Sequence, residues 1–576
     1  MSAWSDLLPC ARLVPELPKL LPRGRWSPAR LLEKNARERP RQAALLYLDE
    51  RYSWGEVEAR ANQYAHCLSS RGVGRGDVVA LLMDNRPDFL FIELGLSKLG
   101  AVTALLNTNL SGRSLAHAVA AARPRAVVVG AEHEARLAGL ELGDGLADRV
   151  LVQSETGDGA DFNRQVAAAA RTPVRTSAPR ASDPTSYIYT SGTTGLPKAA
   201  VVTNQRYLGA SALFGRVMHQ LVPGDVLYVT LPLYHSSAQW MGWGACMLAG
   251  ATMALRRKFS AQAFWPDVER HGATHLLYIG ELCRYLLETP PSPAERHHRL
   301  RVAVGNGLRA DVWTRFQARF RIPVIREFYG ATEGNALLVN LAGRPGMVGR
   351  LLPGQRLLRC DPVTGAPARG ADGLCQPIER GTGLLVAKIS RFARFDGYVD
   401  AKASTKKVVR DVLRAGDAYF DSGDLLTLHE DRWVSFADRV GDTYRWKGEN
   451  VSTSEVAETL GGAPGVLESN VYGVEVPRAE GRVGMASLRV ADDFDLGAFA
   501  AFVRERLPAY QRPYFLRLQR ELDVTGTFKH QKVDCRSQGY DPGRSNDPLY
   551  CLHENHYERI DHDLHERIQR GEIGPR

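Results

Sequence analysis

The sequence predicts an α/β protein with mostly parallel sheets, made of a large N-terminal domain and a small C-terminal α/β domain. Three observations favour this class. In the first part of the chain, short apolar runs typical of buried strands alternate with amphipathic helical segments. The same alternation returns near the C-terminus, after a turn-rich stretch. With 576 residues, the chain is also too long for one ordinary core.

The N-terminal elements follow from the spacing of apolar residues. The segment 29–40 (ARLLEKNARERP) has helical spacing and ends at a proline, and the segment 52–72 has helical spacing up to Gly72. Residues 154–186 are rich in small and polar residues, which predicts a loop. The intervening strands are predicted at residues 43–49, 77–83, 101–107 and 125–130.

The second half of the chain changes character twice. Residues 348–400 have short β-like pieces and many turns, and a compact α/β rhythm begins after Trp446. We therefore predict two domains, at residues 1–438 and 439–576.

The charge, the cysteines and the apolar runs of the sequence indicate which partners and which cellular location to expect. The formal net charge is +10, but no dense Lys/Arg block with interleaved aromatics is present, so no nucleic-acid partner is expected. The 8 cysteines are scattered without a CxxC pair, which favours reduced thiols and a cytoplasmic location. No signal peptide or long apolar run is recognised, so we expect a soluble protein or one peripheral to a membrane. The oligomeric state stays open.

The most informative stretch is YIYTSGTTGLPKAA at residues 187–200. An apolar strand runs into glycines, hydroxyl side chains and a lysine, which are donors that hold phosphate oxygens. The glycine spacing differs from the P-loop, and Ala199 stands where that motif has its magnesium-binding hydroxyl. The predicted phosphate-binding residues are Thr190, Ser191, Gly192, Thr193, Thr194, Gly195 and Lys198.

This run resembles the ATP signature of the adenylate-forming superfamily of acyl-CoA synthetases, peptide-synthetase adenylation domains and luciferases. Motifs resembling those of the superfamily follow in the same order: LPLYH (231–235), FYGATEGN (328–335), SGD (422–424), DRVGDTYRWKGENVSTSEVAETL (438–460) and TGTFKHQKVD (525–534). The phrases YIGELCRYLL, GNGLR and RWKGENVS resemble the branch of fatty-acid transport proteins and very-long-chain acyl-CoA synthetases. The resemblance covers nearly the whole chain.

The resemblance implies ATP-dependent activation of an acid as acyl-AMP, which depends on positioning and charge neutralisation. It implies Glu333 as the magnesium ligand, Thr332 as an α-phosphate contact and Lys529 as the catalytic lysine. His235 is expected at the acyl pocket, with a catalytic role. The remaining expected nucleotide contacts are Tyr329, Gly330, Asp424 and Arg439, the last two at the ribose.

A second step, thioester formation with coenzyme A, is implied by the same resemblance. In that step the C-terminal domain rotates as a mobile lid, removing Lys529 and presenting the segment near Gly448. The implied hinge is Gly441, and glycine tolerates a large φ/ψ change at low cost. ATP, Mg²⁺, coenzyme A and a small-molecule acid are therefore the expected ligands.

The class of acid stays open. The resemblance implies a long or very long fatty acid, with Gly305 and Asn306 in the substrate pocket and a place in fatty acid metabolism. However, Trp240 and Trp243 follow LPLYH, three residues apart, and would share one face of an α-helix. If that face lines the acyl tunnel, the indoles shorten it. If both rings pack into the core, the tunnel stays long.

A shortened tunnel would suit a ligase for a small acid, such as nitrite activated for N–N bond formation or a small carboxylic acid. The acceptor could then be an amine. A non-catalytic lipid carrier is a remote third alternative, which would not need Lys529, Glu333 and Asp424 together. The tail histidines have spacings that suggest metal binding, but a polar amphipathic tail is favoured over a metal site. These histidines are His553, His556, His562 and His565.

Overall fold

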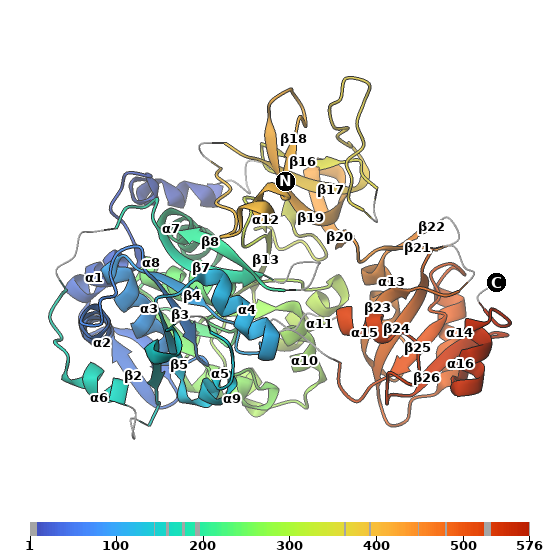
Figure 1. Ribbon diagram of the computed structural model, residues 1–576, viewed down its shortest axis with the longest axis horizontal. Coiled ribbons are helices and arrows are strands. Elements are labelled where there is room, and N and C mark those ends of the chain that lie inside the picture. The colour runs from blue at the N-terminus through green and yellow to red at the C-terminus, as the bar shows by residue number, and fades with distance from the viewer. Residues whose placement is uncertain are drawn as a thin grey trace. The chain divides into compact units, whose positions relative to one another are not determined.

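The computed structural model describes residues 8–142, 145–156, 161–174, 179–190, 196–361, 364–390, 393–446, 449–477, 481–522 and 532–574. The chain forms two compact units (Figure 1). The first consists of residues 1–350 and 389–408, and the second of residues 351–388 and 409–576. The domain boundary predicted at residues 438 and 439 falls inside the second unit and stays a prediction.

The first unit contains a sheet of eight strands in the order β14-β13-β12-β11-β9-β10-β1-β2. The neighbours from β13 to β1 run parallel, and only the edge strands β14 and β2 are antiparallel to their neighbours. The strands are β1 (Ala43–Tyr47), β2 (Glu50–Ser53), β9 (Val226–Val229), β10 (Thr252–Leu255), β11 (His275–Ile279), β12 (Val302–Asn306), β13 (Val324–Gly330) and β14 (Leu337–Asn340).

A second sheet of the same unit has six strands in the order β6-β5-β3-β4-β7-β8, parallel except for the pair β7–β8. Its strands are β3 (Val78–Leu82), β4 (Val102–Leu105), β5 (Ala126–Gly130), β6 (Val150–Gln153), β7 (Pro184–Thr190) and β8 (Lys198–Thr203). The short strand β15 (Gly349–Arg350) ends the main segment of the unit.

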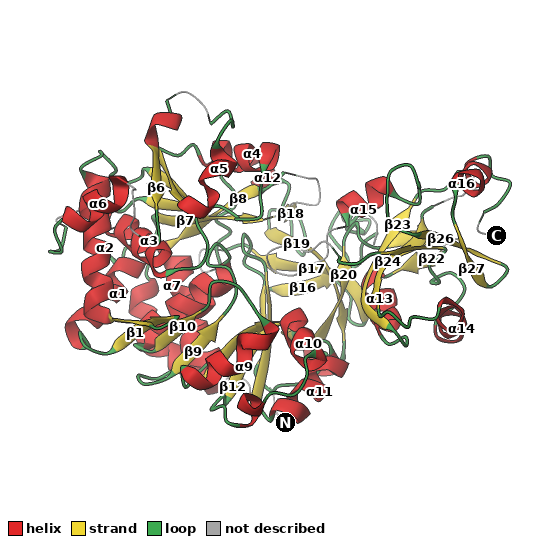
Figure 2. Cartoon of the chain, turned by 90° about the horizontal axis from the view of Figure 1, so that it is seen from below, coloured by secondary structure: helices red, strands yellow, loops and turns green. Residues whose placement is uncertain are grey.

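Helices cover these sheets (Figure 2), and η marks a 3-10 or π-helix. They are η1 (Leu8–Leu20), α1 (Pro28–Glu38), α2 (Trp54–Ser69), α3 (Pro87–Leu99), α4 (Gly112–Ala122), η2 (Ala131–His133), α5 (Glu134–Leu137), η3 (Ala147–Arg149), α6 (Asp161–Ala168), α7 (Asn204–Ala212), η4 (Leu213–Met218), η5 (Ser237–Gly244), α8 (Ala245–Ala249), α9 (Ala261–Arg270), α10 (Gly280–Glu288), η6 (Pro293–Arg296), α11 (Ala310–Phe320) and α12 (Ala401–Thr405).

Two helices show how the sequence sets this architecture. Helix α2 begins at a capping box, because the Ser53 hydroxyl accepts from the Glu56 backbone N–H and the Glu56 carboxylate accepts from the Ser53 N–H. Every residue of helix α3 except Asp88 is buried. A helix that is buried on all sides lies inside a layered protein rather than on its surface. It carries Glu93 into the core, where only 6% of that residue is exposed.

The described residues of the second unit form two hydrophobic cores. The first gathers around four strands in the order β20-β19-β17-β16, with β18 beside β19. The second lies between residues 444 and 568, around a five-stranded sheet of order β23-β24-β25-β26-β27. The strands are β16 (Gln355–Leu358), β17 (Gly381–Lys388), β18 (Val408–Arg410), β19 (Ala418–Leu428), β20 (Trp433–Arg439), β21 (Tyr444–Trp446), β22 (Glu449–Val451), β23 (Val466–Val474), β24 (Val483–Val490), β25 (Phe515–Leu518), β26 (Leu549–His553) and β27 (His556–Arg559). The helices are η7 (Glu430–Arg432), α13 (Thr453–Gly461), α14 (Leu496–Arg506), α15 (Val533–Gln538) and α16 (His562–Gln569).

The predicted α/β class is confirmed, and two local predictions need correction. The expected loop at residues 154–186 contains helix α6 and the start of β7, because the short amphipathic stretch there buries Phe162 and Val166. The expected amphipathic tail is a hairpin, β26–β27, followed by the short helix α16. Tyr557 and Ile560 are buried there, which ties the tail to the second core.

Candidate active site

The site is built where parallel strands of the eight-stranded sheet end. Strands β9, β11, β12 and β13 are neighbours, and their carboxyl ends meet at one edge. The LPLYH segment follows β9, Gly305 and Asn306 end β12, and Thr332 and Glu333 follow β13. Ligands of open α/β sheets bind beyond the carboxyl ends of the strands, so this edge is the expected place for a site.

The segment after β13 contacts the LPLYH segment directly. The Thr332 hydroxyl lies 3.2 Å from the Ser236 hydroxyl, next to His235. His235 is partly exposed, and its ring packs against Tyr234 with centroids 4.6 Å apart. Thr332 of the FYGATEGN motif therefore contacts the residue that directly follows the LPLYH motif, almost a hundred residues earlier in the chain.

Glu333, the predicted magnesium ligand, has a partner that the sequence reasoning missed. The Tyr398 hydroxyl donates to Glu333 Oε1 at 2.9 Å. Burial, followed by the nearby Glu333 charge, raises the pKa of Tyr398, so the phenol stays a donor at neutral pH. A donated hydrogen bond orients the carboxylate and leaves its other oxygen available for a cation.

Arg206 on α7 is a second residue that the sequence reasoning missed. Its guanidinium donates to the Glu333 carbonyl at 3.2 Å, to the Ala331 carbonyl at 3.2 Å and to the Gly334 carbonyl. Burial lowers the pKa of Arg206, and the charges of Asp396 and Glu333 oppose this shift. Arg206 thus holds the backbone of the Glu333 loop. No sequence pattern marks it, because its partners are main-chain atoms from a distant segment.

The predicted phosphate-binding run spans the turn of the β7–β8 hairpin. Thr190 and Lys198 face each other as the last antiparallel pair before that turn. The Thr190 side chain also bonds to Tyr398, the partner of Glu333. Five predicted residues lie outside the described part of the chain: Ser191, Gly192, Thr193, Thr194 and Gly195.

The remaining predicted residues of the first unit are the last residues of β13 and β12, at the same edge of the sheet. Tyr329 and Gly330 end β13. Gly305 pairs with Tyr278 of β11, and a Cβ at Gly305 would clash with the Tyr278 carbonyl oxygen and with its ring. The close approach of Tyr278 explains the glycine in terms of packing. Asn306 is partly exposed at the strand end.

The two tryptophans after LPLYH do not share one face as expected for an α-helix. They belong to the π-helix η5, whose wider turn separates residues three apart. Trp243 is fully buried and stacks on Trp54 of α2, with centroids 5.5 Å apart. The Arg206 guanidinium instead lies over Trp240, 5.9 Å from the centroid of the indole ring. Trp243 is therefore a core residue, whereas Trp240 adjoins the Glu333 loop.

In the second unit, the two predicted ribose residues lie side by side. Asp424 of β19 pairs in register with Arg439 of β20, and Arg439 Nε lies 3.5 Å from Asp424 Oδ1. The Asp424 side chain is 13% exposed, so the arginine offsets a mostly buried charge.

The implied hinge follows directly after β20. Gly441 has a φ of 83°, a conformation that favours glycine. Asp442 next to it pairs with Lys532 at 3.4 Å and with Arg536 at 3.7 Å. Lys529 and Gly448 lie outside the described residues, so their roles stay predictions.

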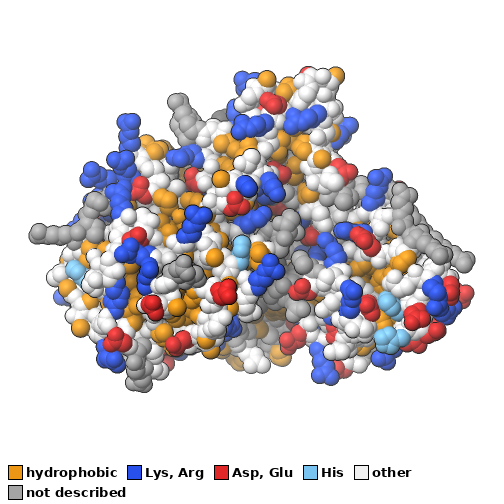
Figure 3. Space-filling model, viewed as in Figure 1, with side chains coloured by type: hydrophobic (Ala, Val, Ile, Leu, Met, Phe, Trp, Pro, Cys, Tyr) orange, Lys and Arg blue, Asp and Glu red, His pale blue; other side chains and the backbone are white. Residues whose placement is uncertain are grey.

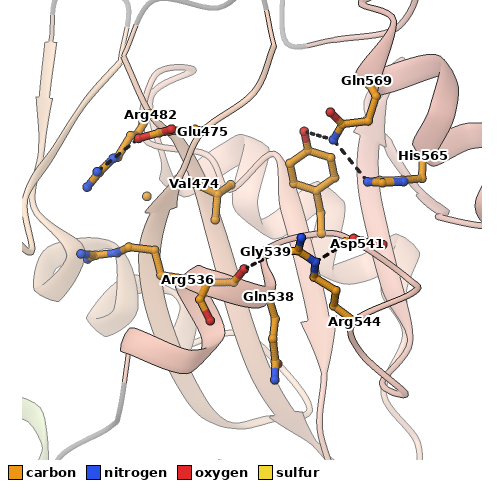
Figure 4. Close-up of a pocket in the computed structure, with 13 residues that line it drawn as sticks. Val474, Glu475, Arg482, Arg536, Gln538, Gly539, Asp541, Arg544, His565 and Gln569 are labelled. Carbon is orange, nitrogen blue, oxygen red and sulfur yellow. Dashed lines mark hydrogen bonds and ion pairs between the residues drawn. The ribbon is translucent and has the colours of Figure 1, made fainter. Parts of the chain in front are cut away.

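A separate pocket of 490 Å³ lies within the second unit and includes none of the predicted site residues. Figure 4 shows Arg482 and Arg536 on one side of it and His565 and Gln569 of α16 on the other. Arg482 pairs with Glu475 at 3.4 Å, and Arg536 pairs with Asp442. Both arginines therefore already have a carboxylate partner.

On the face shown in Figure 3, Lys and Arg side chains are spread over the molecule, with Asp and Glu among them. All 8 cysteines are free. None of the described helices combines the length and the apolar character that a membrane span requires.

Comparison with known proteins places the chain in a family. The model of the AMP-binding enzyme family matches residues 32–374. Long-chain fatty acid transport protein 6 of Mus musculus is 42% identical over 536 residues, covering 90% of this chain and 86% of the relative. The medium/long-chain-fatty-acid–CoA ligase FadD6 of Mycobacterium tuberculosis is 40% identical over 512 residues, covering 88% and 85%.

Solved structures share the fold. The anthranilate CoA ligase AuaEII, in complex with anthranoyl-AMP, has a TM-score of 0.75 at 22% identity and covers 89% of this chain and 97% of its own. ATP-bound MatB from Rhodopseudomonas palustris has a TM-score of 0.75 at 24% identity, with coverage of 89% and 99%. The resemblance inferred from the motifs is thus confirmed, and the chain belongs to the AMP-binding enzyme family as an AMP-forming ligase of the acyl-CoA synthetase type.

Proposed function

We propose that this ligase uses ATP to convert a fatty acid into acyl-AMP and then into a thioester of coenzyme A. The observation that carries the proposal is the set of contacts at the edge of the eight-stranded sheet, where the parallel strands end. There Glu333, held by Tyr398 and Arg206, lies in the loop that contacts the LPLYH segment through Thr332 and Ser236. The similarity to fatty-acid–CoA ligase FadD6 and to fatty acid transport proteins supports a fatty acid as the substrate.

The chemistry required at this edge is charge neutralisation. Attack of a carboxylate on the α-phosphorus of ATP brings two anions together, so cations and hydrogen-bond donors must face the reacting oxygens. The donor set fits this need. The Glu333 carboxylate would hold Mg²⁺, which neutralises phosphate charge when bound, and the Thr332 hydroxyl would donate to the α-phosphate.

In the second unit, the two carboxylate oxygens of Asp424 would accept hydrogen bonds from the two ribose hydroxyls of the nucleotide. Arg439 Nε lies 3.5 Å from Asp424 Oδ1 and would hold the carboxylate in place for this contact. We further propose that Lys529 bridges the carboxylate and the phosphate during adenylation, and that the segment near Gly448 serves the transfer to coenzyme A.

A second candidate function, a ligase for a small or non-fatty acid, is favoured by Trp240. Its indole is 4% exposed and lies under Arg206, which bonds to the Glu333 loop. If this indole occupies the path of the acyl chain, only a short acid fits, such as a small carboxylic acid or nitrite. The partner would then still be a small-molecule acid, with coenzyme A or an amine as acceptor.

Pyrophosphate release across a panel of acids tests both candidates. The panel runs from nitrite and acetate to saturated C8, C16 and C24 acids, each with and without coenzyme A. The first candidate predicts the highest kcat/KM on C16 or longer and a stoichiometric CoA thioester. Activity confined to nitrite or short acids would favour the second. Release with no acid at all would contradict both.

The free cysteines are consistent with a reducing compartment. We propose a cytoplasmic enzyme that contacts a membrane surface peripherally, as a ligase acting on a membrane-dissolved acid would. Recovery in the membrane fraction that is reversed by high salt supports this, and recovery only in the soluble fraction contradicts it.

A further inference from the structure

The hairpin near the C-terminus brings together side chains that the ligase reaction does not use. Strand β27 is the outer edge of the five-stranded sheet, and among the described strands it pairs with β26 alone. Two residues connect the strands, Glu554 with a φ of 45° and Asn555 with a φ of 71°. Positive φ at both central residues is the mark of a type I′ turn, whose twist matches that of the strands it joins.

This turn sets the register of two histidines. His553 and His556 are the pair that flanks the turn, so their side chains project from the same face of the hairpin. Their ring centroids are 6.2 Å apart. Glu558 lies two residues beyond His556 on β27, which places it on that face as well, and its Oε2 atom lies 3.9 Å from His553 Nδ1.

We propose that His553, His556 and Glu558 form a binding site for a late first-row divalent metal ion, such as Zn²⁺ or Ni²⁺. One donor atom from each of the three lies within 4.8 Å of the others. Metal–nitrogen and metal–oxygen bonds of about 2.0–2.2 Å place the donors of a tetrahedral site about 3.4 Å apart, closer than they lie here. Because His556 and Glu558 are exposed, rotation about their side-chain bonds supplies that approach without moving the backbone.

The donor set defines the class of ion. Two imidazole nitrogens and one carboxylate oxygen suit Zn²⁺, Ni²⁺ and Cu²⁺, whereas Mg²⁺ prefers oxygen ligands alone. The site is therefore distinct in chemistry from the magnesium ligand proposed at Glu333 and does not depend on the proposed function. A bound ion would join the edge strand β27 to β26.

A second cluster of potential metal ligands, at Asp84, Glu132 and His133, shows why the hairpin is preferred. Its carboxylates already have cationic partners: Arg86 lies 2.6 Å from Glu132, and Arg257 lies 3.5 Å from Asp84. A metal ion there would have to displace or repel these guanidinium groups. No lysine or arginine pairs with Glu558 among the ion pairs of the described residues.

The neighbouring histidines of α16 provide a matched control. His562 and His565 have the same spacing in sequence as His553 and His556, and they lie on α16, the helix that follows the hairpin. However, His565 packs on Tyr540 and bonds to Gln569. Among the described residues, neither belongs to a group of three potential ligands.

The test is calorimetric titration of the full-length, tag-free protein with NiCl₂ and, separately, with ZnCl₂. We expect one saturable site. Loss of an outer-shell partner typically weakens metal binding by 10–100-fold, so loss of a direct ligand in His553→Ala or His556→Ala should weaken it at least about tenfold. Glu558→Gln should weaken it less. His562→Ala and His565→Ala should bind as the wild type does.

Unchanged affinity in the His553→Ala/His556→Ala double variant would overturn the proposal, as would the absence of saturable binding by the wild type at millimolar NiCl₂. Equal weakening in His565→Ala would also overturn it, because the ion would then bind the helix. A melting curve of each variant without metal checks folding, and His556→Asn, a smaller polar change at an exposed position, repeats the test if the double variant unfolds. Pyrophosphate release should be the same in the double variant as in the wild type.

Discussion

Replacing Glu93 by glutamine tests whether a protonated carboxyl group lies in the core of the first unit. Glu93 is on the buried helix α3, and only 6% of it is exposed. Burial raises its pKa from the ordinary 4.5 to about 8, and a hydrogen bond with Gln239 offsets only part of that shift. At neutral pH the side chain is therefore mainly neutral, and glutamine is its uncharged isostere.

The size of the expected stability difference between the wild type and Glu93→Gln follows from the linkage between proton binding and folding. Above pH 4.5 the unfolded chain releases the Glu93 proton, while the folded protein retains it up to about pH 8. The folded state then binds more protons than the unfolded state, so the stability falls as pH rises. At 1.36 kcal/mol per pKa unit, the wild type should lose about 3.5 kcal/mol relative to Glu93→Gln between pH 5 and pH 8. Above pH 8 the difference should level off.

Urea unfolding followed by tryptophan fluorescence measures this difference. Most of the tryptophans belong to the first unit, including Trp54, Trp243 and Trp265 in its core, so the signal reports on the unit that contains Glu93. Unfolding midpoints at pH 5, 6, 7 and 8 give the pH dependence for each protein, and comparing the slopes removes any constant offset caused by the amide.

Parallel curves for the wild type and Glu93→Gln, within about 1 kcal/mol from pH 5 to pH 8, would refute the reasoning, since Glu93 would then be ionised or solvated in the folded state. Glu141→Gln, a change at an exposed position, serves as the control and should follow the wild type at every pH.

Four further predictions concern the proposed reaction. Lys529→Ala should abolish adenylate formation but leave transfer from preformed acyl-AMP largely intact, and comparable loss in both assays would point to a folding role. Asp424→Ala should mainly raise the KM for ATP, whereas Glu333→Ala should mainly lower kcat, and an unchanged kcat at saturating Mg²⁺ would exclude the metal role. Tyr398→Phe removes the bond to Glu333 and should lower kcat about tenfold, since hydrogen bonds to charged groups contribute about 1.5–3 kcal/mol. Trp240→Ala should extend the accepted acid to longer chains at a stability cost of about 3–5 kcal/mol, and an unchanged chain-length profile in a folded variant would show that the indole lies outside the acyl path.

Much of the candidate site was accessible from the sequence because its residues lie in short, ordered motifs. The resemblance of LPLYH, FYGATEGN and SGD to motifs of the superfamily nominates His235, Glu333 and Asp424. The residues missed, Arg206 and Tyr398, act on the motifs from outside them. Arg206 bonds to carbonyl groups of residues 331, 333 and 334, and such main-chain contacts leave no pattern in the sequence.

The tryptophan pair shows where local reasoning fails. The interval of three residues predicts a common face only if the helix is an α-helix, and the segment is a π-helix. Stacking against Trp54, which lies almost two hundred residues away in sequence, fixes Trp243 in the core. The helix type and the partner both depend on long-range packing.

By itself, the sequence determined the α/β class, the family and the order of the motifs, because apolar periodicity and short motifs are local properties of a chain. The same locality predicted the strands of the first unit to within a few residues, as β1 and β3 show. Only the tertiary structure decided which motifs touch, such as Thr332 with Ser236, and which side of the core each indole occupies. It also decided that His553 and His556 face each other across a turn rather than along a helix. These outcomes depend on sheet order, turn type and the burial of residues distant in sequence, which spacing along the chain does not encode.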